Sequence, residues 1–324
     1  MTVRVYTSLD TGAPVLTGSR LVDRVKLILM ACLVNGYGSK PAAGWTIGHQ
    51  HADGFSLGNG EGFINLINSG SSAYIAYIME TVTDGSTALA AGVNRRSGVW
   101  SDGSPSGSLQ YFYNPGFTGS NNLHWLVVAD SKTCILMLGA GSSTADLSGG
   151  NGAAHYFGNY LNQSGLGSFC SLGGYSSAGG GALMNATGMM LRHPFTGVVG
   201  QGSDARYSVG SPSYYGSGYA VVRAQLVTGR VQGVRAGLVG YGAAVSGSSV
   251  ASSTVFCGYL RGLVADPVLS FAAPSQVFPA LGLSNTWQAR VTPFTLPDGK
   301  QWVPLYPHVS DLGFFVSLDE ADWG

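Results

Sequence analysis

The chain has 324 residues, a formal net charge of zero and only 10% charged residues, against roughly a quarter in an average globular protein. The neutral balance, with no basic run beyond Arg95-Arg96, argues against nucleic acid as the main partner. The 45% share of hydrophobic residues excludes a disordered chain, and because few charges keep copies apart, we expect other subunits to cover much of the surface.

The first 35 residues predict a strand followed by a helix. Residues MTVRVYTSLD alternate as a strand does, and Ser19 is placed to N-cap a helix over 19–35 that ends at Asn35-Gly36. An apolar stripe at helical spacing runs along Leu21, Val25, Ile28, Leu29 and Cys32. The apolar run at 27–34 is shorter than the ~20 residues of a membrane span, and a leader ending there would be unusually long and would contain Asp10 and Asp23. We therefore expect no signal peptide, no transmembrane segment and no membrane partner.

The stretch GHQHADG, residues 48–54, holds the candidate metal ligands His49, His51 and Asp53. Alternate residues of a strand share one face, but a closed zinc site uses three or four ligands, and Gly48 and Gly54 are expected to bracket a turn. We therefore predict a connecting loop or short hairpin whose side chains form hydrogen bonds. The alternative is a metal site shared between copies at a symmetry axis, which only the assembly would bind.

The rest of the chain predicts strands separated by Gly, Ser and Asn clusters. The expected strands cover 61–67, 73–79, 109–113, 124–138, 219–227, 230–240 and 254–264. The clearest hairpin is 124–138, which turns at residues 130–132, and its continuous apolar arms predict burial on both faces. A second hairpin is expected around Thr228-Gly229.

The segment 139–218 is crowded with Gly and Ser and threaded with aromatic residues, which predicts long ordered loops packed against a partner. We therefore divide the chain into 1–138 (strand, helix and first β region), 139–218 (loop insertion) and 219–324 (C-terminal β region). The three parts are expected to form one β body with an insertion. The fold class is mainly β, a sandwich or open barrel with one N-terminal helix and long Gly/Ser-rich loops.

Catalytic and cofactor motifs are not found. The four cysteines form no CxxC pair and are expected to be buried free thiols, typical of a reducing cytoplasm. The sequence GYSSA at 174–178 lacks the last glycine of a nucleophile elbow, and no P-loop is present. The acidic group Asp319, Glu320 and Asp322 is expected to be solvated. We expect no enzyme activity, no catalytic residue and no cofactor.

The segments VYTSLDTGAPVLTG and ACLVNGYGSKPAAGW resemble the N-terminal part of a family of tailed-bacteriophage virion proteins. HWLVVADSKTCILML, CGYLRGLVADPV and GFFVSLDEADW are similar to later points of that family, so the resemblance covers about half of the chain. It implies a structural part of the virion, in the tail or baseplate, assembled in the host bacterial cytoplasm. It carries over no catalytic or cofactor residue.

We expect this chain to act by symmetric assembly with copies of itself and with other virion proteins. Interfaces favour Tyr, Phe and Arg over Lys, and the chain has 16 Tyr, 13 Phe and 12 Arg but 4 Lys. The interface candidates are Leu21, Val25, Leu29, Tyr156, Phe157, Tyr175, Tyr214 and Tyr215. Two alternatives stay open: a capsid decoration or head-fibre protein, and a tail-tip module that binds a host glycan or receptor.

Overall fold

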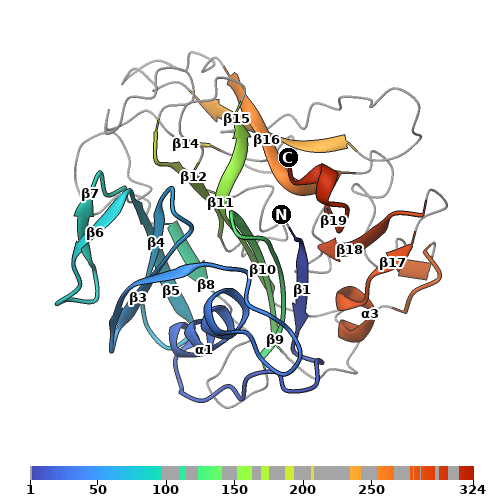
Figure 1. The fold of residues 1–324 in the computed structure, drawn as a ribbon, viewed down its shortest axis with the longest axis horizontal. Helices are drawn as coiled ribbons and strands as arrows, with labels where there is room; N and C mark the ends of the chain where they lie inside the picture. The colour runs from blue at the N-terminus through green and yellow to red at the C-terminus, as the bar shows by residue number, and fades with distance from the viewer. Residues whose placement is uncertain are drawn as a thin grey trace.

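The computed structural model describes residues 2–96, 110–113, 123–140, 152–162, 169–174, 187–192, 206–207, 234–241, 254–265, 278–279, 281–284, 286–295, 299–305 and 314–324. The protein is mainly β, with 52% of residues in strands and 15% in helices, and one sheet curls into a half-barrel. The described strands form a 12-stranded sheet, a five-stranded sheet and a two-stranded hairpin (Figure 1). The predicted mainly-β fold with one N-terminal helix is therefore confirmed.

The N-terminal helix consists of α1, Leu21–Leu29, continued by the π-helical turn η1, Met30–Asn35. Arg20 holds the N-cap position and no side chain caps the helix, so the predicted Ser19 cap is wrong. The predicted apolar stripe is correct, since all five of its residues are fully buried. Gly36 ends the helix where expected, with a φ of 75° that favours glycine.

The five-stranded sheet is antiparallel, in the order β2-β3-β4-β5-β8. Its strands are β2 Thr46–His51, β3 Gly54–Gly58, β4 Phe63–Asn68, β5 Ala73–Met79 and β8 Gln110–Tyr113. Helix α1 packs against β4 and β5, below the sheet in Figure 1. The separate hairpin of β6, Thr81–Asp84, and β7, Ala91–Val93, lies at the outer side of this sheet.

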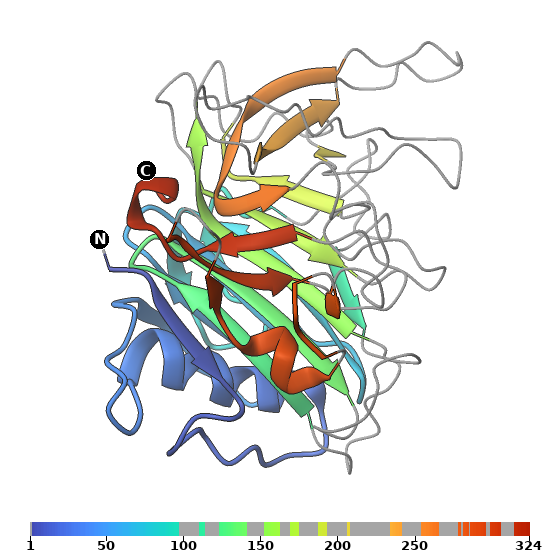
Figure 2. The ribbon, with the colours of Figure 1, turned by 90° about the vertical axis from the view of Figure 1, so that its right-hand side faces the viewer.

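The large sheet has the order β1-β9-β10-β11-β12-β13-β14-β15-β16-β19-β18-β17. Its strands are β1 Arg4–Thr7, β9 Leu123–Ala129, β10 Thr133–Ala140, β11 Gly152–Asn162, β12 Phe169–Gly174, β13 Thr187–Met190, β14 Arg206–Tyr207, β15 Val234–Tyr241, β16 Thr254–Ala265, β17 Phe294–Thr295, β18 Gln301–Leu305 and β19 Phe314–Ser317. Strand β11 also pairs with β16, so the sheet curls back on itself (Figure 2).

The predicted hairpin at 124–138 is confirmed as β9 and β10, which join at residues 130–132. Its side chains alternate between two cores: Val127 and Leu136 face the five-stranded sheet and α1, whereas Leu126 and Ile135 face the C-terminal segment. The second core is covered by β18, β19 and the short helix α3, Trp287–Val291. Burial on both faces explains why both arms are continuously apolar.

The described part of the Gly-rich segment 139–218 contradicts the prediction of a loop insertion there. Strands β11 to β14 lie in the middle of the large sheet and pair directly with β10 before the segment and β15 after it. Glycines of β11 and β12 lie where the backbones approach closely: Gly158 has a φ of 113°, and a Cβ atom there would lie 2.8 Å from the Cα of Thr133. The predicted strand 219–227 and the hairpin around Thr228-Gly229 lie outside the described residues.

Candidate functional site

The GHQHADG stretch forms a β-hairpin. His49 and His51 lie in β2, Gly54 begins β3, and the turn is Ala52-Asp53, so the hairpin prediction is correct but Gly48 lies inside a strand. A register shift between Ile47 and His49 marks a bulge there. The three candidate ligands therefore do not converge, and among the described residues no group of three or more His, Cys, Asp or Glu could hold a metal ion.

Each candidate ligand has its own protein partner. His49 is buried, with its Nδ1 atom 2.9 Å from Ser56 Oγ and its Nε2 atom 3.3 Å from the carbonyl of Ala88, and burial lowers its pKa. His51 Nδ1 accepts from the backbone N–H of Asp53 at 3.1 Å. The carboxylate of Asp53 is paired with Arg20, on the helix. These contacts close the hairpin and hold it to the start of α1.

A buried histidine between the two sheets has the contacts of a Ser–His pair. His155 Nε2 lies 2.8 Å from Ser171 Oγ, its Nδ1 lies 3.3 Å from Tyr74 Oη, and the ring of Phe112 stacks on it at 3.9 Å between centroids. Nucleophilic catalysis needs such a pair to reach a substrate. His155 and Ser171 are both buried, so a substrate does not reach them, and burial holds the pKa of His155 well below its usual range. We conclude that His155 is structural: it is held by Ser171 within the large sheet and contacts Tyr74 and Phe112 of the five-stranded sheet.

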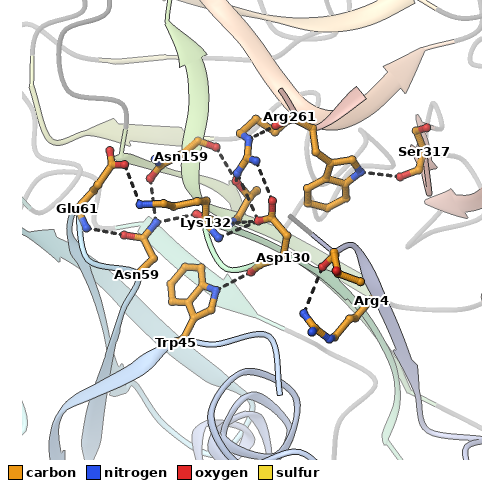
Figure 3. Close-up of polar contacts among 12 residues, drawn as sticks. Arg4, Trp45, Asn59, Glu61, Asp130, Lys132, Asn159, Arg261 and Ser317 are labelled. Atoms are coloured by element: carbon orange, nitrogen blue, oxygen red, sulfur yellow. Dashed lines mark hydrogen bonds and ion pairs between the residues drawn. The ribbon is translucent and has the colours of Figure 1, made fainter. Parts of the chain in front are cut away.

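The centre of the polar contacts is an ion pair between Asp130 and Arg261 that joins the hairpin turn to β16 (Figure 3). Arg261 Nη2 donates to Asp130 Oδ2 at 2.7 Å, and its Nη1 donates to Thr133 Oγ1 at 2.8 Å. Asp130 Oδ1 also accepts from the backbone N–H groups of Lys132 and Thr133, at 2.8 and 2.7 Å. The side chains are 0% and 4% exposed, so the pair is shielded from water.

The same turn continues into a second group of polar residues toward the five-stranded sheet. Asn59, in the loop after β3, donates through Nδ2 to the carbonyl of Lys132 at 2.6 Å and to Asn159 Oδ1 at 2.8 Å. Lys132 Nζ donates to Glu61 Oε1 at 3.0 Å. We call Asn59, Glu61, Asp130, Lys132, Asn159 and Arg261 the polar junction; its members come from both sheets and from segments up to 202 residues apart in sequence.

The sequence pattern did not single out the polar junction. The available signal was a single charged residue inside an apolar run, as in VVADSKT and YLRGLV. A charge in such a run must be paired when it is buried. Spacing could not identify the partner, since Asp130 and Arg261 are far apart along the chain.

The N-terminal segments VYTSLDTGAPVLTG and ACLVNGYGSKPAAGW form one hydrogen-bonded unit at the edge of the large sheet. Lys40 Nζ donates to the carbonyl of Val5 at 2.7 Å, and Asp10 Oδ2 accepts from Thr7 N at 2.7 Å and from Tyr37 Oη at 2.6 Å. These backbone groups lie on the side of β1 away from β9, because Ser8 N bonds to the β9 side. The side chains of Lys40 and Asp10 thus occupy the open edge of β1, which prevents a strand of another chain from pairing with it.

Two glycines of the ACLVNGYG segment allow this unit to close. A Cβ atom on Gly36 would lie 2.7 Å from the carbonyl oxygen of Lys40, and one on Gly38, with a φ of 54°, would lie 2.8 Å from that of Thr11. Trp45 then donates from Nε1 to the carbonyl of Asp130 at 2.9 Å. The resemblance segment therefore ends in direct contact with the polar junction.

The predicted interface residues that the structure describes lie in the core of the chain itself. Leu21, Val25, Leu29, Tyr156 and Phe157 are all 0% exposed. Their assignment as subunit contacts is wrong, because the helix stripe packs on the sheets and β11 is an interior strand. Tyr175, Tyr214 and Tyr215 lie outside the described residues.

Cys32, Cys134 and Cys170 are buried free thiols, as predicted. Burial raises the pKa of Cys32 and of Cys134 well above the usual range, which makes both poor nucleophiles. The side chain of Cys257 lies outside the described residues.

Among the described residues, no helix combines the length and apolar character that crossing a membrane requires. Asp319 and Asp322, expected to be solvated, each pair with Lys300, at 2.5 and 3.2 Å, so the acidic group near 320 is engaged in structure. No protein-family model, curated protein or solved structure matches the chain.

Proposed function

We propose that this chain is a structural component of a bacteriophage virion, in the tail or baseplate, and that it acts by symmetric assembly with copies of itself and other virion proteins. The observation that carries the proposal is the N-terminal resemblance, which rests on residues that fold as one unit: Asp10, Tyr37, Lys40 and Trp45 are joined through hydrogen bonds to β1 and to the hairpin turn. The chain would be assembled in the host cytoplasm.

The composition supports assembly as the mode of action. Only 10% of residues are charged, and a monomeric surface usually needs roughly 25–35%. The buried polar groups around His49, His155 and Asp130 are each paired inside the protein. These groups stabilise the fold, and we infer that the surface, which is poor in charges, serves subunit contacts.

The contact surface must lie outside the helix stripe, because that stripe is buried. The described residues show an alternative on the loop between β1 and α1, where Val15 is 83% exposed and Leu9 is 45% exposed. Both lie within the resemblance segment SLDTGAPVLTG. We infer that this loop contributes apolar contacts to a neighbouring subunit.

Sedimentation velocity of the purified protein over a wide concentration range tests assembly. We expect discrete oligomers, weakened by Val15→Asp and unaffected by Thr17→Asp, a change at an exposed polar position of the same loop. Electron microscopy of virions carrying a tagged copy then gives the location: density at the tail supports the proposal, and density at the head supports a capsid decoration or head-fibre protein. A monomer at every concentration, together with virions that lack the protein, would refute the proposal.

Specific binding to an array of host surface glycans would instead favour the tail-tip binding module. That outcome is compatible with presence in the tail but not with a purely structural role.

A further inference from the structure

Three groups of the polar junction, an amine, a carboxylate and a carboxamide, lie together. Lys132 lies in the β9–β10 turn, and Asn59 and Glu61 lie in the β3–β4 loop of the other sheet. The Nζ atom of Lys132 lies 3.0 Å from Glu61 Oε1, and the carboxamide of Asn59 contacts the backbone of Lys132. An amine, a carboxylate and a carboxamide are therefore brought together from two sheets (Figure 3).

The carboxamide of Asn59 is held as an electrophile. Its Oδ1 atom accepts from the backbone N–H of Glu61 at 2.9 Å and from that of Gly62 at 3.2 Å. Two backbone donors on one carbonyl oxygen polarise the carbonyl carbon and stabilise the negative charge that an attack would place on the oxygen. Its Nδ2 atom is held by the carbonyl of Lys132 and by Asn159, which fixes the plane of the amide.

Glu61 is placed to accept the proton that keeps Lys132 from reacting. A lysine amine is a nucleophile only after it loses its proton. A general base must lie within about 2.6–3.2 Å of the group it deprotonates, and the Lys132–Glu61 distance is in that range. No oxidant, metal or co-reactant is needed for this step.

We propose that Lys132 and Asn59 form an intramolecular isopeptide bond that covalently joins the two sheets, with Glu61 transferring the protons. Glu61 takes a proton from the ammonium of Lys132, and the free Nζ attacks Cγ of Asn59, forming the Nζ–Cγ bond. Nδ2 takes this proton from Glu61, the bond from Cγ to Nδ2 breaks, and ammonia leaves. Glu61 then accepts the second proton of Nζ, which leaves a neutral amide, and this proton passes to the released ammonia to give the ammonium ion. The net change converts one ammonium and one carboxamide into one secondary amide and one ammonium ion, so the protein loses one positive charge.

The partial exposure of the reacting groups sets the rate. The side chains of Lys132 and Glu61 are 32% and 41% exposed, so water stabilises the ion pair and opposes proton transfer within it. We therefore expect slow linking during incubation of the folded protein, and none in denaturant, where the three groups separate.

The test is mass spectrometry of the purified full-length protein, intact and after proteolysis, over days at pH 7. The expected result is the loss of one ammonia and a branched peptide that joins the segments containing Asn59 and Lys132. The intact mass is insufficient, because Asn59 precedes Gly60 and ring closure to a succinimide would release the same ammonia. The branched peptide distinguishes the two products.

Two variants make the test specific. Lys132→Arg keeps the charge opposite Glu61 but cannot form the amide, so no branched peptide is expected. Glu61→Gln removes the group that accepts the proton while its ion pair with Lys132 is partly exposed, so the variant should fold and should link more slowly than wild type at the same pH. A wild-type protein that forms no branched peptide at pH 7 or pH 9 would overturn the proposal, as would a branch at Asn159. Neither result bears on the virion role, which the sedimentation and microscopy experiments test separately.

Discussion

Replacing Arg261 with Met should strongly destabilise the protein, because it leaves the buried carboxylate of Asp130 without its counter-charge. Arg261 donates to Asp130, to Thr133 Oγ1 and to the carbonyl of Trp323, and its side chain is 4% exposed. Breaking a buried ion pair from one side costs about 3–5 kcal/mol. Asp130 keeps two backbone N–H bonds in the variant, which places the expected loss near the lower end, at about 3 kcal/mol.

Urea unfolding followed by circular dichroism measures this loss of unfolding free energy. The matched control is Arg20→Met, which removes the ion pairs of Arg20 with Asp23 and with Asp53. Because the Arg20 side chain is 30% exposed, this change should lower the unfolding free energy by less than about 1 kcal/mol. Adding Asp130→Asn to Arg261→Met should cost less than the sum of the two single changes, because the second change removes the stranded charge. If Arg261→Met costs no more than the control, the pair is not shielded from water and the reasoning fails.

Four further changes test other parts of the fold. Gly262→Ala should destabilise the protein by more than 1 kcal/mol in the same assay, because φ is 68° and a Cβ atom would overlap the ring of Trp323. Lys40→Ala should free the edge of β1 and increase aggregation, measured by light scattering. Burial opposes ionisation of Asp10, but its hydrogen bonds, led by that from Lys40, outweigh burial and lower the pKa of Asp10. The ionised Asp10 therefore stabilises the fold above pH 4, and this stabilisation is lost as the pH falls through the lowered pKa. The unfolding free energies of Asp10→Asn and wild type should therefore converge in acid. Burial lowers the pKa of His155, so wild-type stability should fall as the pH drops below about 6.5, and His155→Phe should remove part of that dependence.

Local patterns in the sequence were sufficient where one element decides its own structure. The spacing of Leu21, Val25 and Ile28 predicted the buried helix face, and Asn35-Gly36 predicted its end. The apolar arms around residues 130–132 predicted a hairpin buried on both sides. These predictions succeed because helical and strand periodicity depend on neighbours a few residues away.

The Gly-rich segment 139–218 shows where a prediction from composition was wrong. Gly and Tyr in GAAHYFGNY suggested an ordered loop at a subunit contact, yet β11 pairs with three other strands of the large sheet and buries Tyr156 and Phe157. Glycine is rare in strands in general, but it is needed where backbones approach closely, as at Gly158. The aromatic residues that suggested an interface pack inside the chain.

The sequence by itself determined the mainly-β class, the helix with its buried stripe, the central hairpin and the buried thiols, since each follows from short-range patterns or from composition. Only the tertiary structure decided which polar residues meet. His49, His51 and Asp53 are close in sequence, but their side chains bond to different groups: His49 to Ser56, His51 to the backbone N–H of Asp53, and Asp53 to Arg20. Asp130 meets Arg261, and Lys132 meets Glu61, through strand pairings that span much of the chain. Spacing cannot encode such contacts, because they depend on the order and register in which distant strands pair.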